Sequence, residues 1–151
     1  MHVAHYLGLQ HRAEANLADA FRQVAAAHAA EADVFHLTGK LAAQCDQHVE
    51  RLAPFIETYS AEAPDEPERL HADLFAGARS GGLGLLRDLH DLYLMASYAD
   101  ITWTVLGQAA AGLRDGDLAA VVAACEQETS IQLAWLRTRM KSAAPQALVV
   151  A

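Results

Sequence analysis

The segment Leu41–Leu52 reads LAAQCDQHVERL, and its apolar positions recur at steps of three and four residues. This spacing is typical of an amphipathic helix, because side chains three and four residues apart lie on one helix face. The stripe that we expect to face a core also contains Cys45 and His48, which are one turn apart. Such side chains are typical of a metal site inside a helix bundle and equally of a hydrogen-bonded core histidine.

The composition sets limits on the class of protein. The chain has 151 residues, of which 53% are hydrophobic and only 7% aromatic, so alanine supplies much of the apolar content and favours helices. The formal charge of −8 argues against nucleic acid and against an anionic membrane surface as partners. Because we find neither a signal peptide nor a membrane-spanning apolar segment, we expect a cytoplasmic protein.

Apolar periodicity along the rest of the chain predicts an all-α four-helix bundle. The expected helices are His2–Ala30, Asp33–Ala53, Leu83–Ala111 and Asp117–Lys141. Between the second and third helices we expect a long crossover, with an acidic loop over Glu62–Glu68 and a short amphipathic helix around Leu70, Leu74 and Ala78. The bundle would form one domain over residues 1–141, followed by a flexible tail over residues 142–151.

Local residues suggest where these helices begin and end. Asp33 and Asp117 are placed to cap the second and fourth helices, because aspartate accepts hydrogen bonds from free backbone N–H groups at a helix start. Pro54 should kink or end the second helix, since proline lacks the N–H that an interior position donates.

The third helix is apolar on two faces. One face carries the core register, and a second carries Leu94, Met95, Tyr98 and Val105. A helix of this kind usually packs on more than one neighbour. We therefore expect a homodimer that uses this helix.

Polar residues interrupt two apolar seams in matching patterns. The first helix contains Gln10 and Glu14, and the fourth contains Glu128 and Gln132. A buried carboxylate without a partner costs several kcal/mol, so Glu14 needs a cation, a metal, a donor network or its own proton. If the first and fourth helices were antiparallel neighbours, the two pairs would meet at one level.

Carboxylates and imidazoles that face inward from a bundle are typical ligands of iron or manganese. The candidate ligands are Glu14, His48 and Glu128, with Asp91 added if the third helix is suitably rotated and Cys45 as a weaker candidate. The usual di-metal pattern has two Glu-x-x-His pairs, whereas this chain has Cys45-x-x-His48 and a Cys-x-x-Glu pair.

Two other interpretations stay open beside a metal site. In the first, Glu, Gln and His form an inert hydrogen-bond network that fixes the register of the helices. In the second, Trp103, Trp135 and Tyr98 line an apolar ligand pocket.

The chain also resembles the stress-associated, ferritin-like four-helix bundles known as a domain of unknown function. The segment Leu9–Leu17, with Glu14, is similar to the opening pattern of that family, and His48–Leu52 is similar to its His-x-x-Arg-Leu motif. Asp91–Tyr98 follows a family pattern that normally reads Glu-His-Tyr-Glu-Ile-Ala-Ser-Tyr, and Glu126–Glu128 matches an acidic triplet. The resemblance implies a ferritin-like fold that is often dimeric.

The chain departs from the family at positions that normally carry ligands. Asp91, Leu92 and Leu94 replace a Glu, a His and a second Glu, and Ala43 and Gln44 replace carboxylates before the histidine. The resemblance therefore implies a degenerate centre in a non-catalytic or weakly metal-binding, stress-associated bundle. The alternative is an oxidoreductase with one or two Fe or Mn ions that acts on O2 or peroxide.

Overall fold

The protein is described here by a computed structural model that covers residues 2–61, 65 and 74–150. Its elements are α1 (Val3–Ala27), α2 (Ala32–Ser60), α3 (Gly81–Leu113), α4 (Gly116–Pro145) and a terminal π-helix, η1 (Gln146–Val150). The described residues contain no strand. The predicted all-α architecture with four long helices is confirmed.

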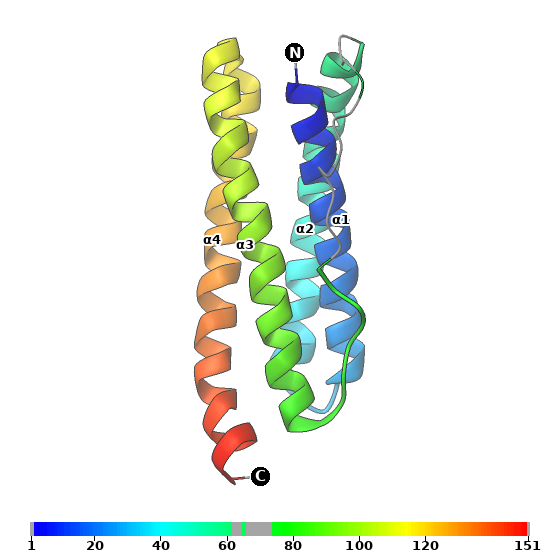
Figure 1. Ribbon diagram of the computed structural model, residues 1–151, viewed down its shortest axis with the longest axis vertical. Helices are drawn as coiled ribbons and strands as arrows, with labels where there is room; N and C mark the ends of the chain where they lie inside the picture. The colour runs from blue at the N-terminus through cyan, green and yellow to red at the C-terminus, as the bar shows by residue number, and fades with distance from the viewer. Residues whose placement is uncertain (1, 62–64, 66–73, 151) are drawn as a thin grey trace.

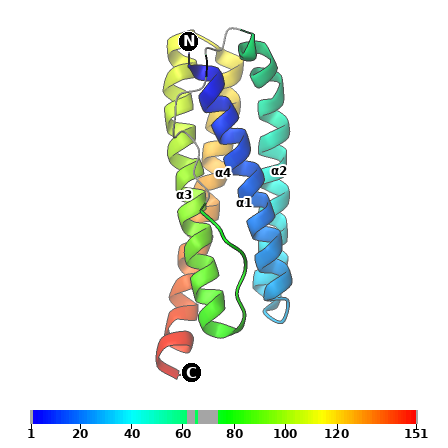
Figure 2. The ribbon, with the colours of Figure 1, turned by 45° about the vertical axis from the view of Figure 1, so that its right-hand side comes forward.

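The four long helices lie side by side along one long axis (Figures 1 and 2). α1 packs against α2 and α3, α3 packs against α4, and α2 also contacts α4. α1 and α4 run in one direction and α2 and α3 in the other (Figure 1). α1 and α4 are therefore parallel and their backbones are not neighbours, so the antiparallel pairing that we considered for them does not form.

α2 ends and α3 begins at opposite ends of the bundle (Figure 1). The described part of the connection, residues 74–80, has no helix, so the predicted short helix is wrong over this stretch. Gly77 has a φ of 125°, which interrupts a helix. The part of that predicted helix around Leu70, like most of the acidic loop Glu62–Glu68, lies outside the described residues.

α2 continues through Pro54 to Ser60, so the predicted end near Ala53 is wrong. Tertiary contacts hold the extra turns in place. Ile56 packs on the buried core, and the hydroxyl of Tyr59 donates a hydrogen bond to Asp115 over 2.7 Å. These contacts offset the hydrogen bond that proline cannot make.

The caps also differ from the prediction by two residues. Asp115, not Asp117, caps α4, and its side chain accepts a hydrogen bond from the N–H of Leu118 over 3.0 Å. Asp33 lies in the first turn of α2 and pairs with Arg139 of α4 over 2.7 Å. Helical structure continues past residue 141 to residue 150, and the flexibility expected of residues 142–151 stays a prediction.

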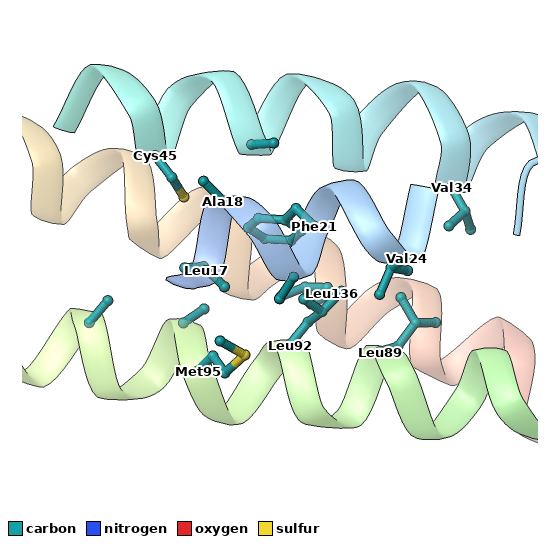
Figure 3. Close-up of a cluster of buried hydrophobic side chains, with 14 of the residues drawn as sticks. Leu17, Ala18, Phe21, Val24, Val34, Cys45, Leu89, Leu92, Met95 and Leu136 are labelled. Atoms are coloured by element: carbon teal, nitrogen blue, oxygen red, sulfur yellow. The ribbon is translucent and has the colours of Figure 1, made fainter. Parts of the chain in front are cut away.

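The apolar core consists of two separate clusters. One is built around Leu17, Phe21 and Leu136, and Figure 3 shows its side chains converging from all four helices. The other is built around Leu7 and Leu52. Polar side chains occupy the level between the two clusters.

Candidate functional site

A layer of fully buried polar side chains separates the two apolar clusters. Gln10 and Glu14 come from α1, His48 from α2 and Gln132 from α4, and each is 0% exposed. We call these four residues the polar layer. The helical register that places their apolar neighbours in the core also turns these side chains inward. The sequence prediction that Glu14 and His48 face the core is therefore correct.

His48 lies between two carboxylates from different helices. Its Nε2 is 2.7 Å from Oε2 of Glu128, and its Nδ1 is 3.1 Å from Oε1 of Glu14. The Nδ1 contact lies outside hydrogen-bond geometry, so we treat it as an electrostatic contact. A neutral imidazole has only one N–H, whereas both ring nitrogens here face acceptors, so the protonated ring suits the site best.

The electrostatics agree with this geometry. Burial by itself lowers the pKa of His48, but the contact with Glu14 and its charge, followed by those of Glu128, outweigh burial and raise the pKa above 6.5. The charged form of the ring is therefore stabilised inside the bundle. Glu14 and Glu128 lie on the two sides of the His48 ring, so α2 joins them, and they do not meet as residues of antiparallel neighbours, the arrangement that we considered from the sequence.

Glu14 has one satisfied and one unsatisfied carboxylate oxygen. The indole Nε1 of Trp103 donates a hydrogen bond to Oε1 over 3.0 Å, and the indole ring meets the ring of His48 edge to face at 5.8 Å. Oε2 of Glu14 is buried without a partner, as is Oε1 of Gln10 one turn earlier. The amide Nε2 of Gln10 donates to the backbone carbonyl of Ala99 over 2.9 Å.

Glu128 connects the polar layer to solvent. Its side chain is 32% exposed, and Oε1 lies 3.8 Å from the guanidinium of Arg51. His48 and Arg51 thus supply two cations beside the carboxylates of Glu14 and Glu128. The arrangement balances its charge without any group from outside the chain.

The two cysteines are buried, free thiols. Burial, and then the charge of Glu14, raise the pKa of Cys45 well above its usual value, and burial raises the pKa of Cys125 to about 12. The side chain of Gln132 contacts Cys45 over 3.7 Å and donates to Gln44 over 2.7 Å. A neutral thiol is a poor nucleophile, so the raised pKa values make both cysteines unreactive in this arrangement.

Asp91, which we expected as a further ligand, does not join this site. Its Oδ2 accepts a hydrogen bond from Arg79 over 2.8 Å. Arg79 also donates to the fully buried Asp88 from its backbone N–H and its guanidinium, each over 2.9 Å. Nε2 of His28 lies 2.7 Å from Asp88, so this second network ties the crossover to α3 and to the end of α1.

The apolar pocket expected from the aromatic residues does not form as one site. Trp103 is fully buried in the core. Trp135 packs at the edge of the other cluster, and Tyr98 lines a small surface hollow with Ala13 and Met95. The three side chains are therefore separated.

The donor set does not fit a metal ion as it is arranged. Within the part of the chain that the structure describes, no three His, Cys, Asp or Glu side chains are grouped so that they could hold one. Both nitrogens of His48 already face carboxylates, so the groups form a chain with the ring in its middle. A metal would require His48 to leave at least one of Glu14 and Glu128.

Comparison with known proteins does not identify the chain. No protein-family model, curated protein or solved structure matches it. No helix among the described residues is both long and apolar enough to cross a membrane. The resemblance to stress-associated ferritin-like bundles stays a prediction.

Sequence reasoning missed Trp103 and Asp88 as members of polar networks. Asp88 falls on the core stripe between Leu85 and Leu92, and an aspartate at such a position signals a buried partner. No comparable signal marks Trp103, because an indole on a core stripe is equally suited to purely apolar packing.

Proposed function

We propose that this protein is a non-catalytic, ferritin-like helical bundle that acts through contacts with other protein chains. The observation that carries the proposal is the position of His48 between Glu14 and Glu128. A protonated imidazole there occupies the place that a metal ion would take in a carboxylate-bridged bundle. The opposite directions of α2 and α3 relative to α1 and α4, with a long crossover, support the ferritin-like topology.

The balance of charge supports a structural role for this centre. A carboxylate left unpaired in the interior costs several kcal/mol, and a neighbouring cation offsets that cost. Because Glu14 contacts His48 of α2 and Trp103 of α3, the polar layer fixes the register of α1, α2 and α3. In coiled coils, too, buried polar residues fix the register of neighbouring helices.

Metal analysis tests the proposal directly. Protein produced with iron and manganese supplied should contain far less than one metal ion per chain after desalting. A matched His48→Gln variant should show the same metal content. Near-stoichiometric metal in the wild type that is lost in the variant would overturn a non-catalytic role for the centre.

The partner surface that we propose is the outer face of α3, which would pair with a second copy of the chain. Leu94, Ile101 and Val105 lie on one helix face and are 52%, 59% and 42% exposed, and Tyr6 of α1 adjoins Val105. We call these four residues the α3 face. α3 has 33 residues and is roughly 50 Å long, which is enough for two copies to bury a standard interface.

One observation favours a rival function. Oε2 of Glu14 is buried and has no partner, and such an atom is a suitable ligand for Fe or Mn. The rival protein would be a weakly metal-loaded oxidoreductase acting on O2 or peroxide, with Glu14, His48 and Glu128 as ligands after rearrangement. Unchanged metal content in Glu14→Ala would rule this rival out.

A further inference from the structure

The α3 face carries a projecting side chain and a hollow on opposite sides of Val105. Ile101, one turn before Val105, is 59% exposed, more than any other large apolar side chain of α3. One turn after Val105, an apolar hollow of about 290 Å³ opens between α3 and α1. Its lining residues include Val3 and Tyr6 of α1 and Val105, Ala109 and Leu113 of α3. The projection and the hollow therefore lie on one helix face, one turn to either side of Val105.

The surface around this face is almost free of charge, although the chain carries a formal charge of −8. Between Asp91 and Arg114, the only charged residue of α3 is Asp100. Asp100 lies toward the α4 side of the helix, because Thr104, one turn later, donates a hydrogen bond to Glu126 of α4 over 2.7 Å. Two copies can therefore bring their α3 faces together without placing like charges opposite each other.

The hollow is less suited to a small molecule than to a side chain of another protein. Small-molecule sites enclose most of the ligand and place several polar groups to orient it. Here Tyr6 and Val105, which line the hollow, stay 36% and 42% exposed, and among the lining residues only His2 and Tyr6 have polar side-chain atoms. A surface hollow of this kind suits an apolar side chain that arrives on its own backbone.

We infer, resting on the homodimer proposed above, that two copies pack α3 against α3 in antiparallel directions, with the two-fold axis at Val105. An axis perpendicular to the two helices places residues equally far before and after Val105 opposite each other. Ile101 of each copy then lies opposite Ala109 of the other and inserts into the hollow beside it. The α3 face is self-complementary in this arrangement.

A parallel pairing of the two helices does not fill the hollow. A two-fold axis along the helices places each residue opposite its own counterpart. Ile101 would then meet Ile101, and one hollow would face the other. The atoms that line an unfilled hollow lose their packing partners, so the antiparallel arrangement is favoured.

Disulfide cross-linking tests the position of the axis. Helix axes about 8–10 Å apart, with Cα atoms about 2.3 Å from each axis, bring the two Val105 Cα atoms to roughly 5 Å. This separation lies within the range of about 4.4–6.8 Å that a disulfide spans. Val105→Cys should therefore form a covalent dimer under mild oxidation with oxidised glutathione. The native thiols of Cys45 and Cys125 should not compete, because both are buried and burial raises the pKa of each.

Leu94→Cys is the matched control for this variant. Leu94 lies on the same face and is 52% exposed, so a cysteine there is equally open to the oxidant. In the antiparallel pair the two Leu94 positions lie roughly 33 Å apart, so this variant should not cross-link. In a parallel pair, or through random collision, it would cross-link as readily as Val105→Cys.

Filling the hollow tests the insertion of Ile101. Ala109→Leu occupies the hollow, whereas Ala111→Leu places the same side chain on α3 at an exposed position outside it. Light scattering across a dilution series measures the Kd of the dimer. Ala109→Leu should raise that Kd at least about tenfold, and Ala111→Leu should leave it unchanged.

The outcomes separate this arrangement from the homodimer itself. A dimer that Val105→Cys fails to cross-link, equal cross-linking of Val105→Cys and Leu94→Cys, or equal effects of the two alanine substitutions would each overturn the antiparallel arrangement. The proposed homodimer would still stand in those cases. A wild type that stays monomeric at all concentrations would overturn both.

Discussion

Trp103 and Glu14 are joined in the interior by a hydrogen bond of 3.0 Å, in which the indole N–H donates to a carboxylate oxygen. The same oxygen lies 3.1 Å from the ring of His48. One oxygen of Glu14 therefore faces two partners while the other has none. The two contacts of this oxygen hold α1 at one level against α2 and α3. A shift of either neighbouring helix would leave a buried charge without compensation.

The substitution Trp103→Phe removes the N–H donor and keeps an aromatic ring in the core. The free energy of unfolding should fall by about 1–3 kcal/mol, the cost of a buried acceptor left without its partner, with a further loss for the smaller ring. Urea denaturation followed by circular dichroism measures this change.

Trp135→Phe is the matched control for that variant. Trp135 is only partly buried, and its indole makes no hydrogen bond within the described residues. The free energy of unfolding should fall clearly less in Trp135→Phe than in Trp103→Phe. Equal losses in the two variants would show that ring volume, and not the bond to Glu14, sets the effect.

The raised pKa of His48 makes part of the stability depend on pH. Because the pKa in the folded protein lies above the ordinary value of 6.5, the contribution is fully present below pH 6.5 and is lost as pH rises through the folded pKa. His48→Gln should remove that dependence. Below pH 6.5 the free energy of unfolding of His48→Gln should be lower than that of the wild type by about 3–5 kcal/mol, the range for breaking a buried ion pair.

Urea midpoints measured from acidic to mildly alkaline pH test this prediction. His90→Gln is the control, because His90 is exposed on α3 and, among the described residues, has a polar contact with Arg87 alone. Its stability curve should run parallel to that of the wild type. If the His48→Gln curve also ran parallel, the charged state of His48 would not contribute to stability.

Sequence periodicity was sufficient to predict the helices and the inward position of Glu14 and His48. Both follow from local rules, since a side chain on an apolar seam must point into the core. The rotation of α3 about its axis depends on packing with α1 and α4, so the sequence misplaced Asp91. The continuation of α2 past Pro54 depends likewise on contacts with the distant α3–α4 turn.

The ion pairs around Asp88 should hold the crossover against α3. Asp88→Asn weakens the contacts with Arg79 and His28 together, since the amide loses the charge that the guanidinium faces and keeps only one acceptor oxygen for the two partners. Trypsin should then cleave after Arg79 at least about tenfold faster than in the wild type, because local opening governs such cleavage. Asp46→Asn, which loosens an exposed ion pair with Arg22, should leave the rate unchanged. Unchanged cleavage in Asp88→Asn would show that the crossover is held by other contacts.

Substitutions at two exposed isoleucines test whether the α3 face forms the dimer interface. Ile101 on α3 is 59% exposed and Ile131 on α4 is 62% exposed, so a charge at either position should disturb the monomer little. If α3 pairs with a second copy, Ile101→Glu buries a charge at the interface and should weaken the dimer by more than about tenfold, whereas Ile131→Glu should not. Light scattering across a dilution series should give a two-subunit mass for the wild type and for Ile131→Glu, and a one-subunit mass for Ile101→Glu. A monomeric wild type at all concentrations would refute the predicted homodimer.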